Sequence, residues 1–384
     1  MADRIVSMEC FVVAPRWAFL KITTADGLTG WGEPVVEGKA HTVIQAVQEF
    51  SDALVGHDPD RIEDIFQMLY RGSFYRGGPV LMSAISGIDQ ALWDIKGKRV
   101  GLPVYELLGG AVRDRIQAYS WVGGDEPAET AVAAKKRVEA GWKAVKLNGA
   151  PRVGWFETPA GIRRIVEEAE AVRNAVGWDV GIGLDFHGRV HKGLAKTLIK
   201  ELEPLKPMFI EEPVVSEQIP AMADLARQTS IPIATGERIY GRWGFRSLLE
   251  SGCVDIVQPD LSHAGGLWEV RKIAAMAEAY DVAVAPHAPL GPVNLAASLQ
   301  LDFCTPNAFI QETSLGIHYH AGGPDLMDYV SGDFFELKDG FFERNSRPGL
   351  GVEINEKAVR HAAEKGHAWR NPVWRQPDGS VAEW

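Results

Sequence analysis

Hydrophobic and polar positions alternate along the first part of the chain. Residues 4–13 and 18–34 show the period of two that strands require, and Asp26-Gly27 in the second stretch is a hairpin signal. The pattern then changes to the helical period over three stretches, at residues 40–56, 61–71 and 83–100. We therefore expect an N-terminal α+β unit that covers residues 1–115.

From residue 116 onwards, short β-rich runs alternate with helical stretches. Eight runs can be read, at residues 116–122, 143–149, 180–188, 207–213, 231–237, 254–260, 281–287 and 308–314. Strands that alternate with helices in this way predict an α/β fold of the (β/α) barrel type, whose functional groups sit where the strands end. An open, doubly wound sheet is less favoured, because no glycine-rich phosphate loop follows the first strand.

The repeat stops after residue 330, and the rest of the chain has too few residues for another domain. We therefore expect the α+β unit to be followed by a barrel at residues 116–330 and a C-terminal segment at residues 331–384. The C-terminal segment ends in a tryptophan-rich tail, and we expect it to pack back against the first unit. A chain of 384 residues is longer than one simple core usually holds, which also indicates two structural units.

Composition and charge narrow the range of functions. The formal net charge is −11 and no basic stripe is visible, which argues against a nucleic-acid partner. No apolar run approaches the roughly 20 residues of a membrane-spanning helix, and the N-terminus does not have the pattern of a signal peptide. The cysteines, Cys10, Cys253 and Cys304, are far apart and form no CxxC. These features predict a reduced, cytoplasmic protein.

Several of the β-rich runs end in an acid or a histidine. Asp185, Glu211 and Glu237 follow one another at intervals of 26 residues, about one strand–helix unit. We expect them on adjacent strands at the same height, where three carboxylates would repel one another and resist ionisation. A hard cation resolves this repulsion, and Mg²⁺ prefers oxygen ligands. A single acid would more simply cap the next helix, but three in register favour a metal site.

Two histidines stand close to acids in the predicted barrel. His187 lies two residues after Asp185, so both side chains would project to one side of a strand. His287 ends the run that follows Asp260, and a carboxylate on the neighbouring strand would fix the tautomer of the ring and raise its basicity. A helix cap is the alternative role for Asp260, and a polar turn at a strand end is the alternative for the first pair.

The motifs around these residues form a recognisable set. They include "FYRGGPVLMSAISGIDQALWDIKGK", "GLDFHGRV", "FIEEPV", "GERIYGR", "QPDLSHAGG" and "APHAPLGP". The chain resembles the enolase superfamily, mandelate-racemase subgroup, over nearly its whole length. The resemblance implies a capping domain on a modified (β/α)7β barrel, and it implies that Asp185, Glu211 and Glu237 hold Mg²⁺. It also selects Glu211 over Glu212 as the second metal ligand, a choice that the sequence alone leaves open.

The resemblance further implies roles in catalysis. His287, paired with Asp260, would take the proton alpha to a substrate carboxylate, and His187 would protonate the departing 3-hydroxyl. Glu312 would hydrogen-bond the substrate carboxylate as charge builds there, and Lys146 would contact the same group.

Substrate contacts are also expected from Asn148 and from two capping loops that contain Arg16 and Tyr75. Racemases of this type carry Lys-x-Lys at the end of the second barrel strand, whereas this chain has Lys146, Leu147 and Asn148 there. Racemisation needs a proton donor and a proton acceptor on opposite faces of the substrate, so the asparagine favours elimination.

The reaction predicted is a Mg²⁺-dependent dehydration of a small sugar acid to a 2-keto-3-deoxy acid through an enolate. The resemblance implies a homo-oligomer, specifically an octamer. Dehydration of gluconate or another aldonic acid and epimerisation or racemisation at C2 are alternatives on the same scaffold. A non-catalytic protein that binds a metal and a sugar acid is disfavoured, because binding alone requires neither histidine.

Overall fold

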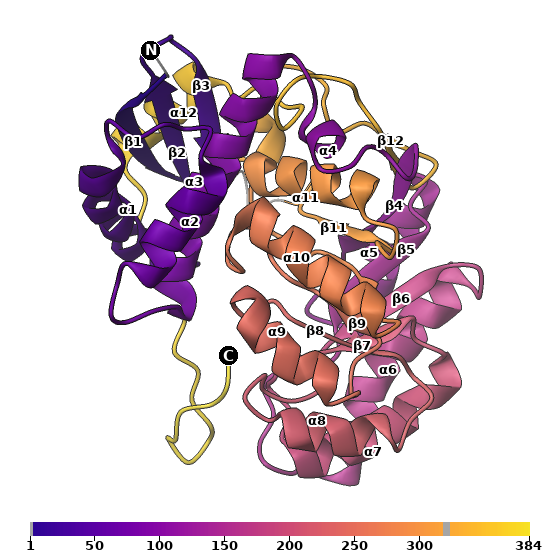
Figure 1. Ribbon diagram of the computed structural model, residues 1–384. Coiled ribbons are helices and arrows are strands. Elements are labelled where there is room, and N and C mark those ends of the chain that lie inside the picture. The colour runs from indigo at the N-terminus through magenta and orange to yellow at the C-terminus, as the bar shows by residue number, and fades with distance from the viewer. Residues whose placement is uncertain (1–2, 318–322) are drawn as a thin grey trace.

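The N-terminal unit is a three-stranded antiparallel sheet covered by helices. The computed structural model describes residues 3–317 and 323–384, and Figure 1 shows this unit beside the barrel. The sheet has the order β1 (Ile5–Val13), β2 (Trp17–Thr24) and β3 (Thr29–Gly32). The helices are α1 (Ala40–Leu54), α2 (Ile62–Arg71) and α3 (Gly78–Val100). The predicted hairpin and the three predicted helices are confirmed, although α3 begins earlier than its pattern indicates.

Glycine allows β3 and α3 to approach each other closely. A Cβ atom on Gly32 would lie 1.8 Å from the carbonyl oxygen of Gly87, and one on Gly30 would lie 2.1 Å from that of Ala91. Both distances are far inside van der Waals contact, so only the absence of a side chain permits this packing. The close approach fixes the position of Glu33, which follows β3 directly.

Eight parallel strands form the barrel in the described part of the chain. They are β4 (Arg115–Trp121), β5 (Ala144–Asn148), β6 (Gly181–Asp185), β7 (Phe209–Glu211), β8 (Ile233–Thr235), β9 (Ile256–Val257), β10 (Ala283–Val284) and β11 (Gln311–Thr313). The pairing runs from β4 in order to β10, and β11 pairs with β4. A bridge between Val284 and Ala308 joins the two ends, which confirms the predicted barrel and rules out the open sheet.

Each of the first seven barrel strands is followed by a helix. These helices are α5 (Pro127–Glu139), α6 (Pro159–Val176), α7 (Lys192–Leu202), α8 (Ile219–Ala226), α9 (Gly241–Glu250), α10 (Gly266–Ala279) and α11 (Pro292–Cys304). Short elements complete the connections, namely α4 (Val104–Leu107), η1 (Glu203–Leu205) and η2 (Leu326–Tyr329). The arrangement is therefore the (β/α)7β variant of the barrel that the resemblance implied.

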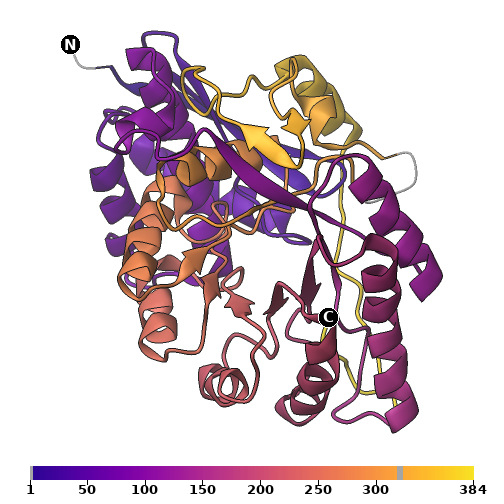
Figure 2. The same cartoon turned by 90° about the vertical axis from the view of Figure 1, so that its right-hand side faces the viewer.

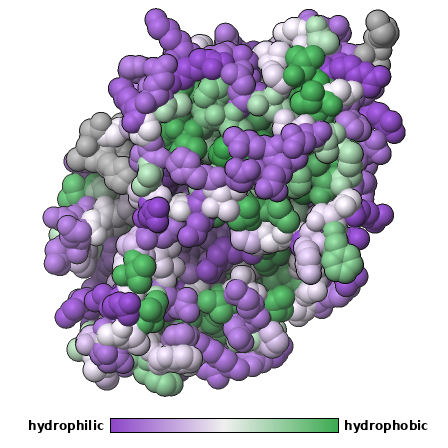
Figure 3. All heavy atoms as spheres, turned by 90° about the vertical axis from the view of Figure 1, so that its left-hand side faces the viewer, coloured by the Kyte–Doolittle hydropathy of each residue, from purple (hydrophilic) through white to green (hydrophobic). Residues whose placement is uncertain are grey.

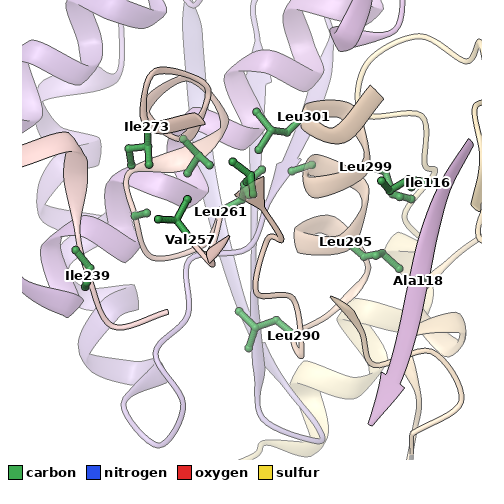
Figure 4. Packing of buried hydrophobic residues seen from close by; sticks show 14 of the residues in the cluster. Ile116, Ala118, Ile239, Val257, Leu261, Ile273, Leu290, Leu295, Leu299 and Leu301 are labelled. Carbon is green, nitrogen blue, oxygen red and sulfur yellow. The ribbon is translucent and has the colours of Figure 1, made fainter. Parts of the chain in front are cut away.

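The core lies between the barrel and its helices. Figure 4 shows Leu295 and Leu299 of α11 pointing toward Ile116 and Ala118 of β4. A second cluster of buried residues comes from the barrel strands and their ends, and its members are Tyr119, Ala144, Phe209, Ala234, Ile256, Ala285 and Ile310. Side chains therefore fill the space between the strands, and the polar groups at the strand ends form one face of a packed body.

The C-terminal segment contacts both units. Its strands β12 (Leu337–Lys338) and β13 (Phe341–Glu343) extend the sheet from β4, and α12 (Glu356–Lys365) packs on the N-terminal sheet. Lys21 of β2 pairs with Glu356 of α12 at 2.8 Å. The segment thus reaches further than the predicted packing on the first unit, and the unit limits at residues 115 and 330 stay predictions.

The last residues form a tail at the end of the barrel where the strands finish. The side chain of Gln376 donates to the carbonyl of Val153, in the loop after β5. Trp384 packs against Trp369 and Trp374, with ring centroids 6.3 and 6.2 Å away. Figure 2 shows the C-terminus beside the barrel strands. The tail therefore borders the region in which the predicted site lies.

The remaining surface features agree with the composition. Figure 3 shows hydrophilic residues spread over one face of the molecule and around a hollow near its middle. The three cysteines are free thiols, two of them buried. Among the helices of the described residues, none has the length and apolar character needed to cross a membrane.

The glycine contact between β3 and α3 makes a testable prediction. We expect Gly32→Ala to lower the free energy of unfolding by about 1–3 kcal/mol, because the new methyl group would overlap the carbonyl of Gly87. Urea denaturation followed by circular dichroism would measure the change. Gly154→Ala is the matched control, because its nearest neighbouring atom would be 3.5 Å away. Identical transitions for the two variants would contradict the packing argument.

Candidate active site

The three predicted metal ligands meet at the ends of neighbouring strands. Asp185 ends β6 and is paired in register with Glu211, which ends β7. One ligand atom from each of these residues and from Glu237 lies within 4.8 Å of the others. The structure therefore brings together three acids that are separated by 52 residues in the chain.

The predicted equal height of the three acids is only partly correct. Glu211 is paired with Ala234, and β8 ends at Thr235. Glu237 therefore lies beyond its strand, in the following loop, and reaches the other acids from there. A fixed interval along the sequence does not give equal height, because neighbouring barrel strands are staggered.

The acid cluster fits a divalent cation. Asp185 Oδ2, Glu211 Oε1 and Glu237 Oε2 are each buried without a hydrogen bond in the described part of the chain. Buried carboxylate oxygens that lack hydrogen bonds are costly unless a cation neutralises them. All three groups are oxygen donors, the type that hard divalent ions prefer. Asp185 Oδ2 and Glu237 Oε2 do lie within 3.3 Å of basic nitrogens, so the convergence of three carboxylates, more than a lack of partners, is what fits a ligand set.

Lys146 supplies the positive charge nearest to two of these acids. Its Nζ atom lies 2.9 Å from Glu211 Oε2, 2.7 Å from Glu312 Oε1 and 3.3 Å from Asp185 Oδ2. Burial would lower the pKa of this amine, but the surrounding carboxylates raise it well above its usual value. Lys146 is therefore a fixed cation at the edge of the cluster, where it can attract a substrate carboxylate.

Glu212 points away from the cluster, in agreement with the choice of Glu211. Its backbone is left-handed, with φ 42°, and its carboxylate pairs with Arg238 at 2.6 and 2.9 Å. Burial and the nearby charge of Glu237 raise the pKa of Glu212 to about 8. This acid has its own partner and contributes no atom to the ligand set.

His187 lies beside Asp185, but not for the reason that strand alternation gives. The strand ends at Asp185, and His187 adopts a left-handed φ of 50° in the turn that follows. Asp185 Oδ1 accepts the backbone N–H of His187 at 2.8 Å, which tightens this turn. The imidazole Nε2 then lies 3.2 Å from Asp185 Oδ2. Burial lowers the pKa of His187 although the charges of Asp185 and Glu237 oppose this, so its protonated ring is a stronger proton donor.

His287 and Asp260 form the expected pair. Imidazole Nδ1 lies 2.8 Å from Asp260 Oδ2, and the two backbones join in a bridge. Imidazole Nε2 lies 3.1 Å from Glu237 Oε2. Burial would lower the pKa of His287, but Glu237, Glu312 and Asp260 raise it well above its usual value. The ring is thus held as a strong base with Nε2 toward the acid cluster.

The alternative role of Asp260 as a helix cap is not observed, because α10 begins at Gly266 with no side-chain cap. The Oδ1 atom of Asp260 accepts the backbone N–H of Ser262 at 2.6 Å and so caps the turn that leads into α10. Burial would raise the pKa of Asp260, but His263 and His287 lower it below its usual value. One carboxylate therefore caps the loop with one oxygen and holds His287 with the other.

Glu312 closes the site on the side of the last strand. It lies on β11, and its Oε2 atom accepts the backbone N–H of Ala288 at 3.0 Å. The same oxygen is 3.9 Å from His287 Nε2. Glu312 thus links the base, the loop after it and Lys146.

The other predicted substrate contacts lie further out. Asn148 is the last residue of β5 and is paired in register with Asp185, so it stands at the rim of the cluster. Arg16 pairs with Glu37 at 3.0 Å and lies over the ring of Trp369 in the tail. Tyr75 is 81% exposed. The structure brings Asn148 to the site, whereas the contacts of Arg16 and Tyr75 are with capping loops, the tail and solvent.

Sequence reasoning missed a group of buried polar residues behind Asp260. Asn294 of α11 donates its side-chain amide to Asp260 Oδ1 at 2.9 Å and to Ser262 Oγ at 3.0 Å. Gln90 of α3 donates to the same hydroxyl at 3.2 Å. The available signal was a polar residue inside the otherwise apolar run "PVNLAA".

Comparison with known proteins agrees with this fold and site. The family model for the mandelate racemase/muconate lactonizing enzyme N-terminal domain matches residues 6–109, and the enolase C-terminal domain-like model matches residues 129–358. The chain therefore belongs to the mandelate racemase/muconate lactonizing enzyme family of the enolase superfamily. Members of the enolase superfamily use a divalent metal ion, and three acids that could hold such an ion are present here.

Particular relatives resemble nearly the whole chain. Curated proteins named D-galactonate dehydratase from Variovorax paradoxus and Pectobacterium atrosepticum are each 56% identical over 382 residues, which is 99% of this chain and all of theirs. The crystal structure of an enolase from Agrobacterium radiobacter, bound to Na and L-malate, is 33% identical. It covers 99% of both chains with a TM-score of 0.90.

The acid cluster predicts metal-dependent stability. We expect Mg²⁺ or Mn²⁺ at 100 times its dissociation constant to raise the stability of the chain by about 2.7 kcal/mol. Glu211→Gln should abolish most of this increase, because it removes one ligand charge. Thermal denaturation with and without EDTA would measure it.

Glu212→Gln is the neighbouring control for this experiment. It disturbs the pair with Arg238 and lowers the starting stability, but the shift caused by the metal should remain. An equal metal shift in both variants would show that Glu211 is not a ligand.

Proposed function

We propose that this protein is a Mg²⁺-dependent D-galactonate dehydratase, which converts D-galactonate to 2-dehydro-3-deoxy-D-galactonate and water. The observation that carries the proposal is an imidazole on each flank of one acid cluster, His187 after β6 and His287 after β10. The motifs quoted from the sequence resemble those of D-galactonate dehydratase. Full-length relatives of that name at 54–56% identity support the choice of substrate.

The metal ligands are Asp185, Glu211 and Glu237 in this proposal. Mg²⁺ supplies Lewis-acid stabilisation of the negative charge that builds on the substrate carboxylate, an effect of several kcal/mol. Lys146 attracts the same carboxylate with its fixed charge, and Glu312 would donate a hydrogen bond to it in its protonated form as the enolate forms. The acids and the lysine thus orient the substrate with C2 toward the base.

His287 is the general base. Asp260 accepts a hydrogen bond from Nδ1, so Nε2 is the nitrogen that would abstract hydrogen from C2 once the ring is neutral; a cation held by Glu237 would offset the charge that favours the protonated ring. A carboxylate partner stabilises the imidazolium that this step creates. The lowered pKa of Asp260 agrees with this role, because it keeps the carboxylate ionised. The pairing fixes both the tautomer and the direction of the reacting nitrogen.

His187 is the general acid. It protonates the departing 3-hydroxyl, which is otherwise a poor leaving group, and help of this kind is worth roughly 10²–10⁴-fold in rate. The hydrogen bond from its backbone N–H to Asp185 holds the ring next to the metal ligand set. The enol that remains then tautomerises to the 2-keto-3-deoxy acid.

Asn148 favours elimination over the alternative of C2 epimerisation. It occupies the rim position at which a second basic group would face the opposite side of the substrate. Dehydration of another aldonic acid, such as gluconate, would use the same catalytic groups. It would differ only in the residues that contact the hydroxyl groups at C4 and C5. Arg16 and Tyr75 remain proposed contributors to that choice.

The proposal includes a cytoplasmic location and a homo-oligomeric assembly. The three free cysteines support a reducing compartment. The octamer rests on the resemblance to the family alone. Neither nucleic acid nor a membrane is needed for the chemistry described.

A screen of sugar acids tests the proposed substrate. The protein would be incubated with Mg²⁺ and a library of aldonic and aldaric acids, and semicarbazide would detect 2-keto acids. We expect D-galactonate to give the highest kcat/KM. Faster turnover of gluconate would show that gluconate, and not D-galactonate, is the preferred substrate. Metal-dependent binding of galactonate without any keto acid would favour the non-catalytic alternative.

Two histidine variants separate the proposed roles. We expect His187→Asn and His287→Asn each to lower the rate of dehydration by at least about 10²-fold. In D₂O, the His187 variant should still exchange the C2 hydrogen, because the base is intact, whereas the His287 variant should exchange none. Proton NMR of recovered galactonate would follow exchange, and circular dichroism would check the fold. Full dehydration activity in either variant would contradict its assigned role.

A further inference from the structure

Asp260 is held by both of its oxygen atoms. Oδ2 contacts His287 Nδ1 at 2.8 Å, while Oδ1 accepts from Ser262 N at 2.6 Å and from Asn294 Nδ2 at 2.9 Å. The carboxylate and the amide are both fully buried. The acceptor on Asp260 fixes which end of the Asn294 amide faces it, because the amide oxygen could not donate a hydrogen bond.

The capping domain in turn fixes Asn294. Glu33, immediately after β3, accepts the backbone N–H groups of Gly291 at 2.6 Å and Asn294 at 2.9 Å, and so caps the first turn of α11. A Cβ atom on Gly291 would lie 2.6 Å from the Glu33 carboxylate, so a larger residue there would displace that carboxylate. The backbone N–H of Glu33 also donates a hydrogen bond to the side-chain oxygen of Gln90 at 2.7 Å.

A continuous set of hydrogen bonds therefore joins the capping domain to the base. It runs from Glu33 through Asn294 and Asp260 to His287, and each residue in it is buried or nearly so. Without Asn294, Asp260 Oδ1 would keep only the hydrogen bond from the Ser262 backbone N–H, so the carboxylate would be less restrained about its terminal torsion, which is broad. A small misplacement of a reacting group is enough to slow a reaction by about 10²-fold.

We propose that Asn294 is a positioning residue for proton abstraction, and that Glu33 of the capping domain positions Asn294. This inference rests on the proposed dehydratase function for its kinetic readout. Asn294 touches neither substrate nor metal ligand in this arrangement; it acts through Asp260. The capping domain thus contributes to the chemical step as well as covering the site.

Asn294→Ala tests the proposal. We expect kcat for D-galactonate to fall roughly 10- to 100-fold, with KM changed by less than about threefold, because the interaction orients the base and not the substrate. The primary isotope effect on kcat with substrate deuterated at C2 should increase, since proton abstraction becomes slower than the other steps. Asn294→Asp, nearly equal in shape, should lose at least as much, because it places a second carboxylate against Asp260.

Asn307→Ala is the matched control. Asn307 also donates two side-chain hydrogen bonds, to the carbonyls of Ala274 and Val282, but these lie away from His287. This variant should keep the kcat and isotope effect of the unmodified protein. The inference is overturned if both alanine variants lose activity equally, or if Asn294→Ala keeps the original kcat and isotope effect.

A spectroscopic measurement separates this inference from the proposed function. In protein labelled with ¹⁵N-histidine, the Nδ1 proton of His287 should give a downfield signal through its bond to Asp260. We expect that signal to shift or broaden in Asn294→Ala and to persist in Asn307→Ala. Failure of the unmodified protein to dehydrate galactonate would defeat the proposed function only, whereas an unchanged signal in Asn294→Ala would defeat the inference.

Discussion

Mutual repulsion among buried carboxylates is the constraint on which the rest of this site depends. Asp185, Glu211 and Glu237 converge with buried oxygens that lack hydrogen bonds, and burial with the charge of Asp185 raises the pKa of Glu211 well above its usual value. A divalent cation removes that repulsion, and the same cation is what makes a carbon acid beside a carboxylate reactive. A bound divalent cation would therefore both stabilise the site and support its chemistry.

The barrel supplies the acids, while the capping domain supplies order around His287. Glycines at the contact of β3 and α3 place Glu33 where it caps α11, and α11 presents Asn294 to Asp260. Interfaces between domains are often loose enough to permit relative motion. Here buried hydrogen bonds cross the interface close to His287, so the two units are coupled next to the candidate active site.

Sequence alone predicted most of the fold and the central residues, because strand–helix alternation leaves a clear period and strand ends collect polar groups. It misjudged Glu237 and the turn at His187, since strand stagger and a left-handed residue cannot be read from spacing. Asn294 was missed because its partners are distant in the chain; Glu33 precedes it by 261 residues. Such contacts depend on how units pack, which a local pattern does not encode.

The tail has a consequence for how the enzyme is made. Arg189, in the turn after His187, lies under Trp374 at 4.9 Å, and the final residue, Trp384, packs between Trp369 and Trp374. Chains fold from the N-terminus as they emerge from the ribosome. The rim beside His187 is therefore completed by residues that emerge from the ribosome after all eight barrel strands, so the strands can pair before the mouth of the barrel has its full lining.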